Sequence, residues 1–577
     1  MSKRQYRKLL VAAILGLSVS FTAFAPASAA DIAGKTVTAL KITGISTVGE
    51  NTVLSVVKTK AGDKANPDMI KQDLQSIYDT GYFFDVVANF TEVPEGIQVT
   101  YTVMENPLLK EIVIKGNTKV TTEKIKSIMT VKPGTVLNAK ALNDNMRAIE
   151  QYYNDQGYVL AKVSDVSMGQ GGVLTATINE GTLEGIAVKG NDKTQTHVIT
   201  REIKLKTGEP FNAKDAKRSM QKVYNLGFFE DVNMKLNPGK EPNAVVLETN
   251  VVEQKTGTFS IGGGYSQSDG LVGIIELGDN NFRGTGDKIK IHWEFGGNAG
   301  ENKNYEFSYF KPWLDAKQTS IAFSIYDMTN EYTDYRGMNS MDTTYDRQRK
   351  GGEITLGRPA GEFITNYISL KQRNDSFVRM VPENNNPNPI DDKYKEANFG
   401  TTRSVTLMRV FDSRDNIFNP TEGKRYSLSA EFAGKAFGGD FDFNKYTLEG
   451  RQYFKVGEEK VIAVRLMTGY ATGRMPATGK FAIGGANNLR GYDDEEFKGD
   501  KMLAATAEYR FPIVKKVQGV VFGDVGKAWD GEGYKLNDLK VGYGVGLRII
   551  SPLGPIKFDY AWGSESGKAH FSFGGQF

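Results

Sequence analysis

A single arginine stands in an unusual setting within residues 487–497, whose sequence is NNLRGYDDEEF. Arg490 lies between a leucine and a glycine, in a region whose neighbours alternate like membrane strands. A planar guanidinium can hold two carboxylates through directed hydrogen bonds, which the ammonium group of lysine does not reproduce. The alternative is an arginine on a solvated loop. The acidic run behind it has the character of a solvated stretch, and it comprises Asp493, Asp494, Glu495 and Glu496.

The chain shows no residue pattern typical of catalysis or of a bound cofactor. The three histidines, His197, His292 and His570, lie far apart in the sequence, and the acidic residues lack the tight spacing of a metal or acid–base site. Cysteine is absent, which excludes disulfides, thiolate metal sites and a cysteine nucleophile. The glycine-rich stretches are not followed by the Gly-Lys-Ser/Thr and the helix of a nucleotide-binding loop. We therefore expect a protein that is not an enzyme and that uses neither cofactor nor metal.

The first 30 residues differ from the rest of the chain. A basic start is followed by an apolar stretch over residues 9–25 and by Ala-Ser-Ala at positions 27–29. This pattern predicts a secretory signal peptide, and the apolar run is short for an N-terminal anchor helix. Removal of residues 1–30 takes away four basic groups and lowers the formal net charge from +4 to about zero. Nucleic acid is therefore not an expected partner.

Three similar segments follow one another in residues 36–254. Their glycine-containing markers stand 72 and 74 residues apart: ITG at 42–44, IKGN at 114–117 and VKGN at 188–191. An amphipathic helix pattern follows each marker, and a glycine with aromatic residues then suits the end of the helix. Two alternating strands close each segment, which predicts the order strand, helix, helix, strand, strand. The predicted buried helix faces comprise Ile70, Leu74, Ile77 and Tyr78, then Leu142, Met146, Ile149 and Tyr153, then Ala216, Met220, Val223 and Tyr224.

From about residue 257 the sequence alternates strictly between apolar and polar residues. Residues 288–295 read KIKIHWEF, with isoleucine, tryptophan and phenylalanine on one face and charged or polar residues on the other. This period of two fits strands with one face toward lipid and the other toward a polar lumen, and no later segment offers 18 consecutive apolar residues. About sixteen such segments are present, an even number that permits antiparallel closure. A soluble β-sandwich would also alternate.

The last segment is predicted to pair with the first. Residues 569–577, AHFSFGGQF, resemble the C-terminal signal strand of bacterial outer-membrane proteins, and the candidate first strand covers residues 257–266. A strand in lipid must be paired on both edges, so closure requires these two strands to meet. Glycine weakens strands, so we expect this seam to be the least stable closure. The seam residues are Gly262, Gly263, Gly264, Gly574, Gly575 and the terminal Phe577.

The repeats resemble POTRA domains, the periplasmic modules of outer-membrane assembly proteins, although a generic α+β spacer array would share their element order. The chain as a whole is similar to the BamA family of outer-membrane assembly factors. This resemblance implies α+β POTRA repeats (β-α-α-β-β) followed by a 16-stranded antiparallel transmembrane β-barrel. It rests on NNFRGTG at 280–286, DSRD at 412–415, PTEG at 420–423, GG at 484–485 ahead of LRGY at 489–492, SPLGP at 551–555 and the terminal aromatic residue.

The same resemblance assigns a role to the lone arginine. In the family, an Arg-Gly motif on the sixth extracellular loop folds back into the lumen and pairs with carboxylates of the barrel wall. The motif matches Leu489, Arg490, Gly491 and Tyr492 here, and the carboxylates match Glu508 and Asp524. Alternation places Glu508 on the polar face of its strand, because Ala507 and Tyr509 flank it. Asp524 lies in a run that is apolar on both faces, so alternation leaves its direction open.

The predicted domains are a signal peptide (1–30), POTRA repeats (31–106, 107–181 and 182–254) and an outer-membrane β-barrel (255–577). The resemblance implies a barrel in the cell outer membrane with its repeats in the periplasm. It implies a protein that receives unfolded β-barrel precursors and inserts them through the seam between its first and last strands. The implied partners are these clients, outer-membrane lipid, and accessory periplasmic lipoproteins or chaperones.

Three other functions are compatible with parts of the sequence. A TamA-like protein also has three repeats and serves autotransporter assembly or lipid traffic. A two-partner secretion pore has two repeats and a plug helix, and no such helix pattern stands between residues 31 and 36. A passive solute channel would not need the repeats.

Overall fold

A computed structural model describes residues 32–577 except 267–269, 297–303, 335–342, 382–389, 532, 552–553, 564–566 and 574–577. The predicted signal peptide therefore lies outside the described residues. The chain forms two compact units. Among the described residues, the first comprises 32–187, Lys204–Arg218 and Met234–Glu248, and the second comprises Val188–Ile203, Ser219–Asn233 and the described part of 249–573.

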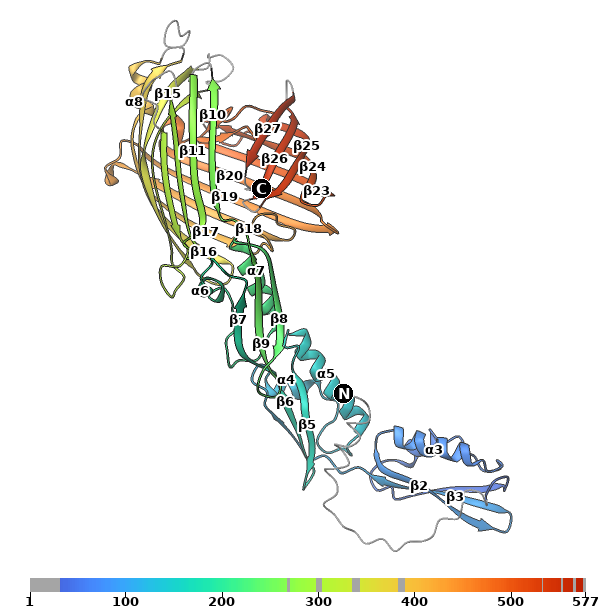
Figure 1. The fold of residues 1–577 in the computed structure, drawn as a ribbon. Coiled ribbons are helices and arrows are strands. Elements are labelled where there is room, and N and C mark those ends of the chain that lie inside the picture. Colours follow the sequence, from blue (N-terminus) through green and yellow to red (C-terminus); the bar gives the residue numbers. More distant parts are fainter. Residues whose placement is uncertain are drawn as a thin grey trace. The chain divides into compact units, whose positions relative to one another are not determined.

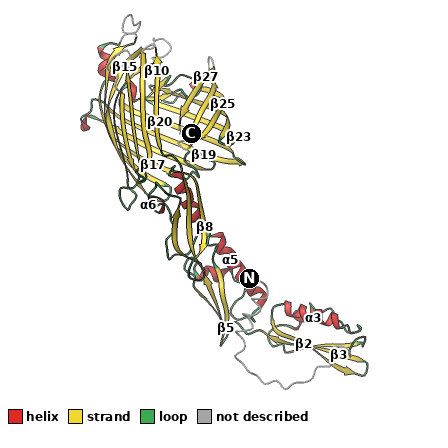
Figure 2. Ribbon diagram, viewed as in Figure 1, coloured by secondary structure: helices red, strands yellow, loops and turns green. Residues whose placement is uncertain are grey.

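Each of the three repeats has the predicted order of elements (Figures 1 and 2). The first contains β1 (Val37–Thr43), α2 (Glu50–Leu54), α3 (Pro67–Asp79), β2 (Phe83–Val93) and β3 (Gly96–Glu105). The second contains β4 (Glu111–Lys115), α4 (Thr122–Ile128), α5 (Ala139–Asp155), β5 (Lys162–Gly169) and β6 (Val173–Asn179). The third contains β7 (Thr182–Lys189), α6 (Thr196–Thr200), α7 (Ala213–Asn225), β8 (Phe229–Pro238) and β9 (Ala244–Glu253).

The last strand of each repeat lies in the middle of its three-stranded sheet. The sheet orders are β1-β3-β2, β4-β6-β5 and β7-β9-β8. In the first two repeats the first strand runs parallel to the central one and the remaining strand runs antiparallel. Each sheet therefore has two edge strands, whose unpaired backbone groups can accept another chain.

The buried helix faces differ from the prediction at two tyrosines. Tyr78 and Tyr224 are exposed at the ends of α3 and α7, whereas Asp73 and Ser219 are buried. A step of one residue turns a helix by about 100°, so the residue after Ile77 or Val223 already leaves the buried stripe. Asp73 remains in that stripe because it accepts hydrogen bonds from the backbone N–H groups of Lys58 and Thr59.

In each repeat, a glutamate near the end of the central strand accepts hydrogen bonds from the turn that follows the first strand. Glu105 accepts hydrogen bonds from the backbone N–H groups of Ser46, Thr47 and Val48, at 2.8–2.9 Å from Oε1. Glu180 accepts from the N–H groups of residues 118 and 119, and Glu253 from those of residues 193 and 194. Partial burial alone would raise the pKa of Glu105. The hydrogen bonds that its carboxylate accepts from residues 46–48 lower the pKa by a larger amount, so the net shift is downward. Each carboxylate thus fixes the turn that follows the first strand.

Replacing Glu105 with glutamine is expected to loosen this turn. The amide keeps one acceptor oxygen, so the contribution lost is about 1 kcal/mol. Because the folded pKa of Glu105 is depressed, its contribution is present above the unfolded pKa of about 4.3 and is lost as the pH falls through the folded pKa. Hydrogen exchange should show faster exchange at residues 46–48 and a weaker acid dependence. Glu95→Gln, at an exposed position in the β2–β3 turn, is the control; equal effects of the two changes would contradict the prediction.

Most of the described residues from 257 onward form one 16-stranded sheet, in the order β10 to β20 and then β23 to β27. Neighbouring strands are antiparallel throughout. The sheet curves into a barrel (Figure 1), which confirms the predicted fold class. Its strands are β10 (Gly257–Ser266), β11 (Gly270–Phe282), β12 (Asp287–Gly296), β13 (Asn304–Lys311), β14 (Ser320–Asp334), β15 (Thr343–Pro359), β16 (Ile364–Met380), β17 (Gly400–Asp412), β18 (Gly423–Ala433), β19 (Asp442–Gly457), β20 (Lys460–Arg474), β23 (Lys501–Val514), β24 (Val517–Trp529), β25 (Lys540–Ser551), β26 (Gly554–Trp562) and β27 (Gly567–Phe573).

Short elements lie in the loops of the barrel. They are α8 (Asp392–Asn398), β21 (Phe481–Ile483), β22 (Phe497–Gly499) and three single 3₁₀ turns at Lys435–Phe437, Ala477–Gly479 and Leu536–Asp538. In the part of the chain that the structure describes, no helix is both long and apolar enough to cross a membrane.

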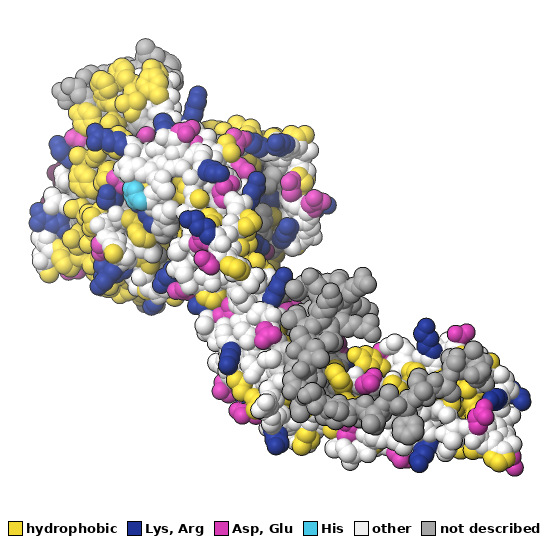
Figure 3. Space-filling model, turned by 60° about the horizontal axis from the view of Figure 1, so that its bottom comes forward, with side chains coloured by type: hydrophobic (Ala, Val, Ile, Leu, Met, Phe, Trp, Pro, Cys, Tyr) yellow, Lys and Arg dark blue, Asp and Glu magenta, His cyan; other side chains and the backbone are white. Residues whose placement is uncertain are grey.

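The alternating sequence produces an apolar outer surface. Ile291, Trp293 and Phe295 of β12 are exposed, and outward positions of the other strands behave in the same way. Figure 3 shows such hydrophobic side chains gathered along the sides of the barrel. An exposed apolar band of this extent suits contact with lipid rather than with water.

The turn between β11 and β12 holds the nearby part of the third repeat within the second compact unit. Asn281 is buried, and its Nδ2 donates to Thr194 Oγ1 at 2.8 Å while its Oδ1 accepts from the backbone N–H of Gly286 at 2.8 Å. The backbone N–H of Gln195 donates to Gly284 O at 2.9 Å. The NNFRGTG motif therefore has a structural explanation as a docking turn.

Asn281→Ala is expected to weaken this docking by about 2 kcal/mol, because it removes two buried hydrogen bonds. Hydrogen exchange of the Gln195 amide should accelerate accordingly. Thr194→Val removes the bond to Asn281 Nδ2 and also removes the Thr194 hydroxyl from Glu253, but it keeps the bond from the Gly286 N–H to Asn281 Oδ1, so exchange at Gln195 should change less than in Asn281→Ala. Unaltered exchange at Gln195 in both variants would show that the motif does not secure this contact.

Candidate functional site

The loop of residues 475–500 folds against the inner wall of the barrel. It leaves β20 and returns to β23, and its two short strands, β21 and β22, pair with each other. Leu489 and Tyr492 are buried in a small apolar cluster with Ile483 of β21 and with residues from the barrel wall. Burial of these two side chains places the intervening Arg490 and Gly491 against the wall.

The tip of the loop is shaped by local hydrogen bonds. Asn488 Oδ1 accepts from the backbone N–H of Gly484 at 2.8 Å, and the N–H of Gly485 donates to Leu489 O at 3.1 Å. Gly485 has φ +93°, and a Cβ atom there would lie 1.8 Å from Asp494 Oδ1. Only glycine is compatible with that backbone and that spacing.

Arg490 is surrounded by three carboxylates of the wall. Its Nε and Nη2 donate to the two oxygens of Asp524 at 2.7 and 2.9 Å, which is a bidentate pair. Its Nη1 donates to Glu508 Oε1 at 2.8 Å and to Asp559 Oδ2 at 3.2 Å. The guanidinium carbon lies 3.4 Å from the centre of the Phe522 ring. Arg490 is 4% exposed, so all of these contacts are sheltered from water.

Further charged side chains extend these contacts into a network. Glu508 Oε2 accepts from Arg510 Nε at 2.9 Å, and Glu508 Oε1 accepts from Arg548 Nη2 at 3.2 Å. Arg548 also forms a bidentate pair with Asp559, at 2.5 and 3.1 Å. Glu508 therefore contacts three guanidinium groups, and the network joins β23, β24, β25 and β26 to the loop. Such a buried network specifies one geometry, because a missing partner leaves an uncompensated charge.

The sequence indicated part of this network. The structure brings Arg490 into contact with both matched carboxylates, and it turns Asp524 inward, which alternation had left open. Asp559, Arg548 and Arg510 did not enter the prediction. A signal for Asp559 was present, because it lies between the outward Phe558 and Tyr560. Alternation identifies such inward positions, but it does not show which of them meet.

The acidic run forms two ion pairs. Asp493 pairs with Lys568 of β27 at 2.5 Å, and Glu495 pairs with Lys498 at 3.5 Å. Both carboxylates are nevertheless more than half exposed, as expected of a solvated stretch, so the two pairs are surface ion pairs. The pairing with Lys568 depends on a strand some 75 positions further along the chain, which the local sequence does not reveal.

The motif also touches β25 and β27. Tyr492 Oη donates to Val541 O at 3.2 Å, and the backbone N–H of Gly491 donates to His570 Nε2 at 2.9 Å. The sequence assigned no role to His570, which lies far from the other two histidines along the chain. The structure gives it a specific acceptor role toward the loop.

The other end of the loop contacts a different part of the wall. Lys498 Nζ donates to Tyr332 Oη of β14 at 2.6 Å and lies 4.0 Å from the centre of that ring. Tyr332 belongs to an aromatic cluster with Tyr345, and Tyr394 of α8 packs against it. The loop is thus held on two walls of the lumen.

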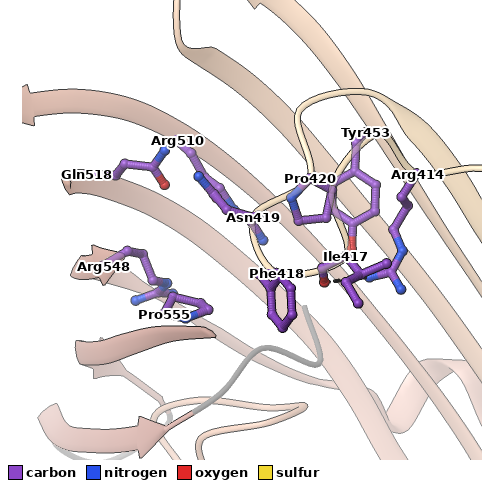
Figure 4. A pocket seen from close by; sticks show the side chains of 10 residues that line it. All are labelled: Arg414, Ile417, Phe418, Asn419, Pro420, Tyr453, Arg510, Gln518, Arg548 and Pro555. Atoms are coloured by element: carbon purple, nitrogen blue, oxygen red, sulfur yellow. Dashed lines mark hydrogen bonds between the residues drawn. The ribbon is translucent and has the colours of Figure 1, made fainter. Parts of the chain in front are cut away.

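A small pocket borders the network (Figure 4). Figure 4 shows Phe418 and Asn419, from the turn between β17 and β18, lying between Arg510 and Arg548 on one side and Tyr453 and Arg414 on the other. Arg414 is paired with Asp412 at 2.7 Å. Among the described residues, no group of three or more histidine, aspartate and glutamate side chains could hold a metal ion.

The predicted seam is described only in part. Gly262, Gly263 and Gly264 lie in β10 and pair with β11. Gly574, Gly575 and Phe577 lie outside the described residues. Within residues 257–266 and 567–573, no pairing joins β10 to β27, which stand at the two ends of the sheet order.

Known protein families match this chain in two parts, the three repeats and the barrel. Residues 281–577 match the Omp85 superfamily domain. The chain belongs to the Omp85 superfamily. Residues 35–106, 107–181 and 182–254 match the POTRA family, described as a surface antigen variable number repeat. The Omp85 superfamily is non-enzymatic, and this chain forms an outer-membrane or outer-envelope β-barrel that carries POTRA repeats.

Similar Omp85 proteins come from both plastids and bacteria. Outer envelope protein 80 of Arabidopsis thaliana chloroplasts is 24% identical over 540 residues, which cover 88% of this chain and 72% of the relative. Outer membrane protein assembly factor BamA of Nitratidesulfovibrio vulgaris is 25% identical over 518 residues, which cover 84% of this chain and 63% of the relative. The solved structure of CdiB from Escherichia coli shares the fold, with a TM-score of 0.60 at 15% identity over 83% of this chain and 91% of that one.

Proposed function

We propose that this Omp85 protein assembles outer-membrane β-barrel proteins, by receiving unfolded precursors on its POTRA repeats and inserting them at the seam between β10 and β27. The observation that carries the proposal is that β10 and β27 stand at the two ends of the sheet order and, within residues 257–266 and 567–573, are not paired with each other. Every other neighbouring pair of barrel strands is joined by a ladder of backbone hydrogen bonds, so this closure separates at the lowest cost.

An opened seam would present strand edges within the bilayer. Backbone N–H and C=O groups cannot remain unpaired in hydrocarbon, so an incoming client strand gains stability by pairing with such an edge. Burial of the client's apolar face in lipid then supplies the driving force. No nucleotide or cofactor enters this proposal.

The repeats supply a place for the client before insertion. In the first repeat, the edge strand β2 carries the exposed side chains of Phe84 and Val87. An extended segment can add to this edge through main-chain hydrogen bonds with little regard to its sequence. That mode of recognition suits many different unfolded precursors. Accessory lipoproteins and chaperones are the further partners that we propose for these domains.

Reconstitution tests the proposal. The purified chain in liposomes should accelerate the folding of a denatured outer-membrane client, and a disulfide across the seam should abolish the acceleration until it is reduced. The natural chain contains no cysteine, so cysteines can be scanned over β10 and β27 without background. A disulfide between positions 560 and 569, which pair between β26 and β27, is the matched control. Full activity with a locked seam would overturn the proposal.

A further inference from the structure

The motif of residues 489–492 contacts five consecutive strands at the C-terminal end of the sheet. Arg490 contacts Glu508 of β23, Asp524 of β24 and Asp559 of β26. The backbone of Arg490 also lies against β25, where a Cβ atom on Gly542 would come within 1.9 Å of Arg490 O. The fifth strand is β27, which ends the sheet order and has β26 as its neighbour there.

The contact with β27 has two polar members. The backbone N–H of Gly491 donates to His570 Nε2 at 2.9 Å, and Lys568 Nζ pairs with Asp493 Oδ1 at 2.5 Å. Lys568 and His570 are two residues apart, so they lie on the same face of the strand, whereas Ala569 and Phe571 between and beyond them are exposed on the other face. Two successive inward positions of β27 are therefore both held by the loop.

The backbone of the motif is shaped for this contact. Gly491 has φ +92°, and a Cβ atom there would lie 2.7 Å from Gly563 N. A Cβ atom on Gly563 would in turn lie 2.3 Å from Gly491 O. The loop and the end of β26 thus meet backbone to backbone, and this approach brings the Gly491 N–H within reach of the neighbouring strand.

We propose that His570 and Lys568 form a latch, through which the loop of residues 475–500 holds β27 in place beside the seam. The inference rests on the proposed function, because it assigns the latch to the strand that bounds the seam. A terminal strand with one sheet neighbour loses its position more readily than a central strand does. The two polar contacts add to its seven-residue pairing with β26. His570 and Lys568 are positioning residues, and Arg490 remains the anchor of the loop on the other four strands.

Electron paramagnetic resonance measures the position of β27 directly. Spin labels are placed at Phe259→Cys of β10 and Ala569→Cys of β27, both exposed positions in a cysteine-free chain, and the protein is reconstituted in lipid nanodiscs. His570→Leu should raise the ratio of displaced to latched β27 by about fivefold, the effect of losing one hydrogen bond. Lys568→Met should raise this ratio by a smaller factor, because the pair with Asp493 is partly exposed. The two changes together should raise it further.

Conservative variants and controls separate the latch from general disruption. His570→Gln keeps an acceptor and Lys568→Arg keeps a cation, so both should restore most of the latched population. His292→Leu and Lys290→Met on β12, the same residue types on another strand, should leave the distribution unchanged. Unchanged distributions in the His570→Leu and Lys568→Met variants, or equal changes in the β12 controls, would overturn the latch. Hydrogen exchange of the Gly491 amide gives a second readout if motion of the spin labels broadens the measured distance distribution.

Client folding on the same variants distinguishes this inference from the proposed function. A seam disulfide that abolishes folding, together with latch variants that leave β27 in place, would overturn the latch and leave the proposed function intact. Latch variants that displace β27 while a locked seam still supports folding would support the latch and overturn the proposed function.

Discussion

Replacing Arg490 with lysine is expected to release the loop tip from the barrel wall and to slow client folding by about tenfold or more. Lysine retains the positive charge, but its ammonium cannot form the fork-like pair with Asp524 and reach Glu508 at the same time. The loss of two charge-assisted hydrogen bonds costs about 3 kcal/mol, which corresponds to an about hundredfold loss of protection for the loop tip.

Two measurements check this prediction. Hydrogen exchange should accelerate at the amides of Arg490 and Gly491, which donate to Asp524 Oδ2 and His570 Nε2 in the folded protein. The liposome assay should show slower client folding at equal barrel content. Arg358→Lys is the matched control, because Arg358 forms an exposed pair with Asp315 at 3.0 Å and such pairs contribute little. Full protection and normal client folding in Arg490→Lys would show that charge alone suffices.

The fold could be predicted from the sequence because its signals are local. Residues 288–295 alternate with period two, and the structure shows Ile291, Trp293 and Phe295 exposed while the side chains between them lie on the opposite face. The helix of residues 142–153 repeats its apolar residues at steps of three and four, and all four predicted positions are buried. The two-residue period of a strand and the 3.6-residue period of a helix determine which side chains share a face, independently of distant parts of the chain.

Only part of the candidate site could be predicted, because its contacts depend on which inward-facing side chains lie at the same level along the barrel axis. Alternation placed Glu508 inward, but Asp559 and Arg548 join it through the stagger of neighbouring strands, which the sequence does not encode locally. The partner of Asp493 lies on β27, and the acceptor for the Gly491 N–H lies on the same strand. Loop path and strand stagger together determine such contacts.

The repeats carried one overlooked signal. Glu105, Glu180 and Glu253 recur at spacings close to those of the glycine markers. Each carboxylate accepts backbone N–H groups from the turn after the first strand of its repeat. A polar residue that repeats with the period of the module indicates a structural role in the module, rather than three separate binding sites.

Glu508→Gln is expected to damage the site more severely than Asp524→Asn. Glu508 contacts Arg490, Arg510 and Arg548, so loss of its charge leaves three buried guanidinium groups short of a counter-charge. Disruption of a buried pair costs about 3–5 kcal/mol. Asp524 forms its bidentate pair with Arg490, which retains Glu508 and Asp559 when Asp524 is neutralised.

The urea concentration at which the barrel unfolds in lipid should therefore fall further for Glu508→Gln than for Asp524→Asn, and client folding should slow in the same order. Glu276→Gln on β11 is the matched control, since Glu276 forms a partly exposed pair with Lys290 at 3.2 Å and exposed pairs contribute about 0–1 kcal/mol. If Asp524→Asn proved the more damaging change, the centre of the network would be the bidentate pair with Arg490 rather than the three-arginine contact of Glu508. The double variant Arg490→Met/Glu508→Gln shows whether Arg490 and Glu508 are energetically coupled. If they are, the effect of the double variant on the unfolding midpoint differs from the sum of the two single effects.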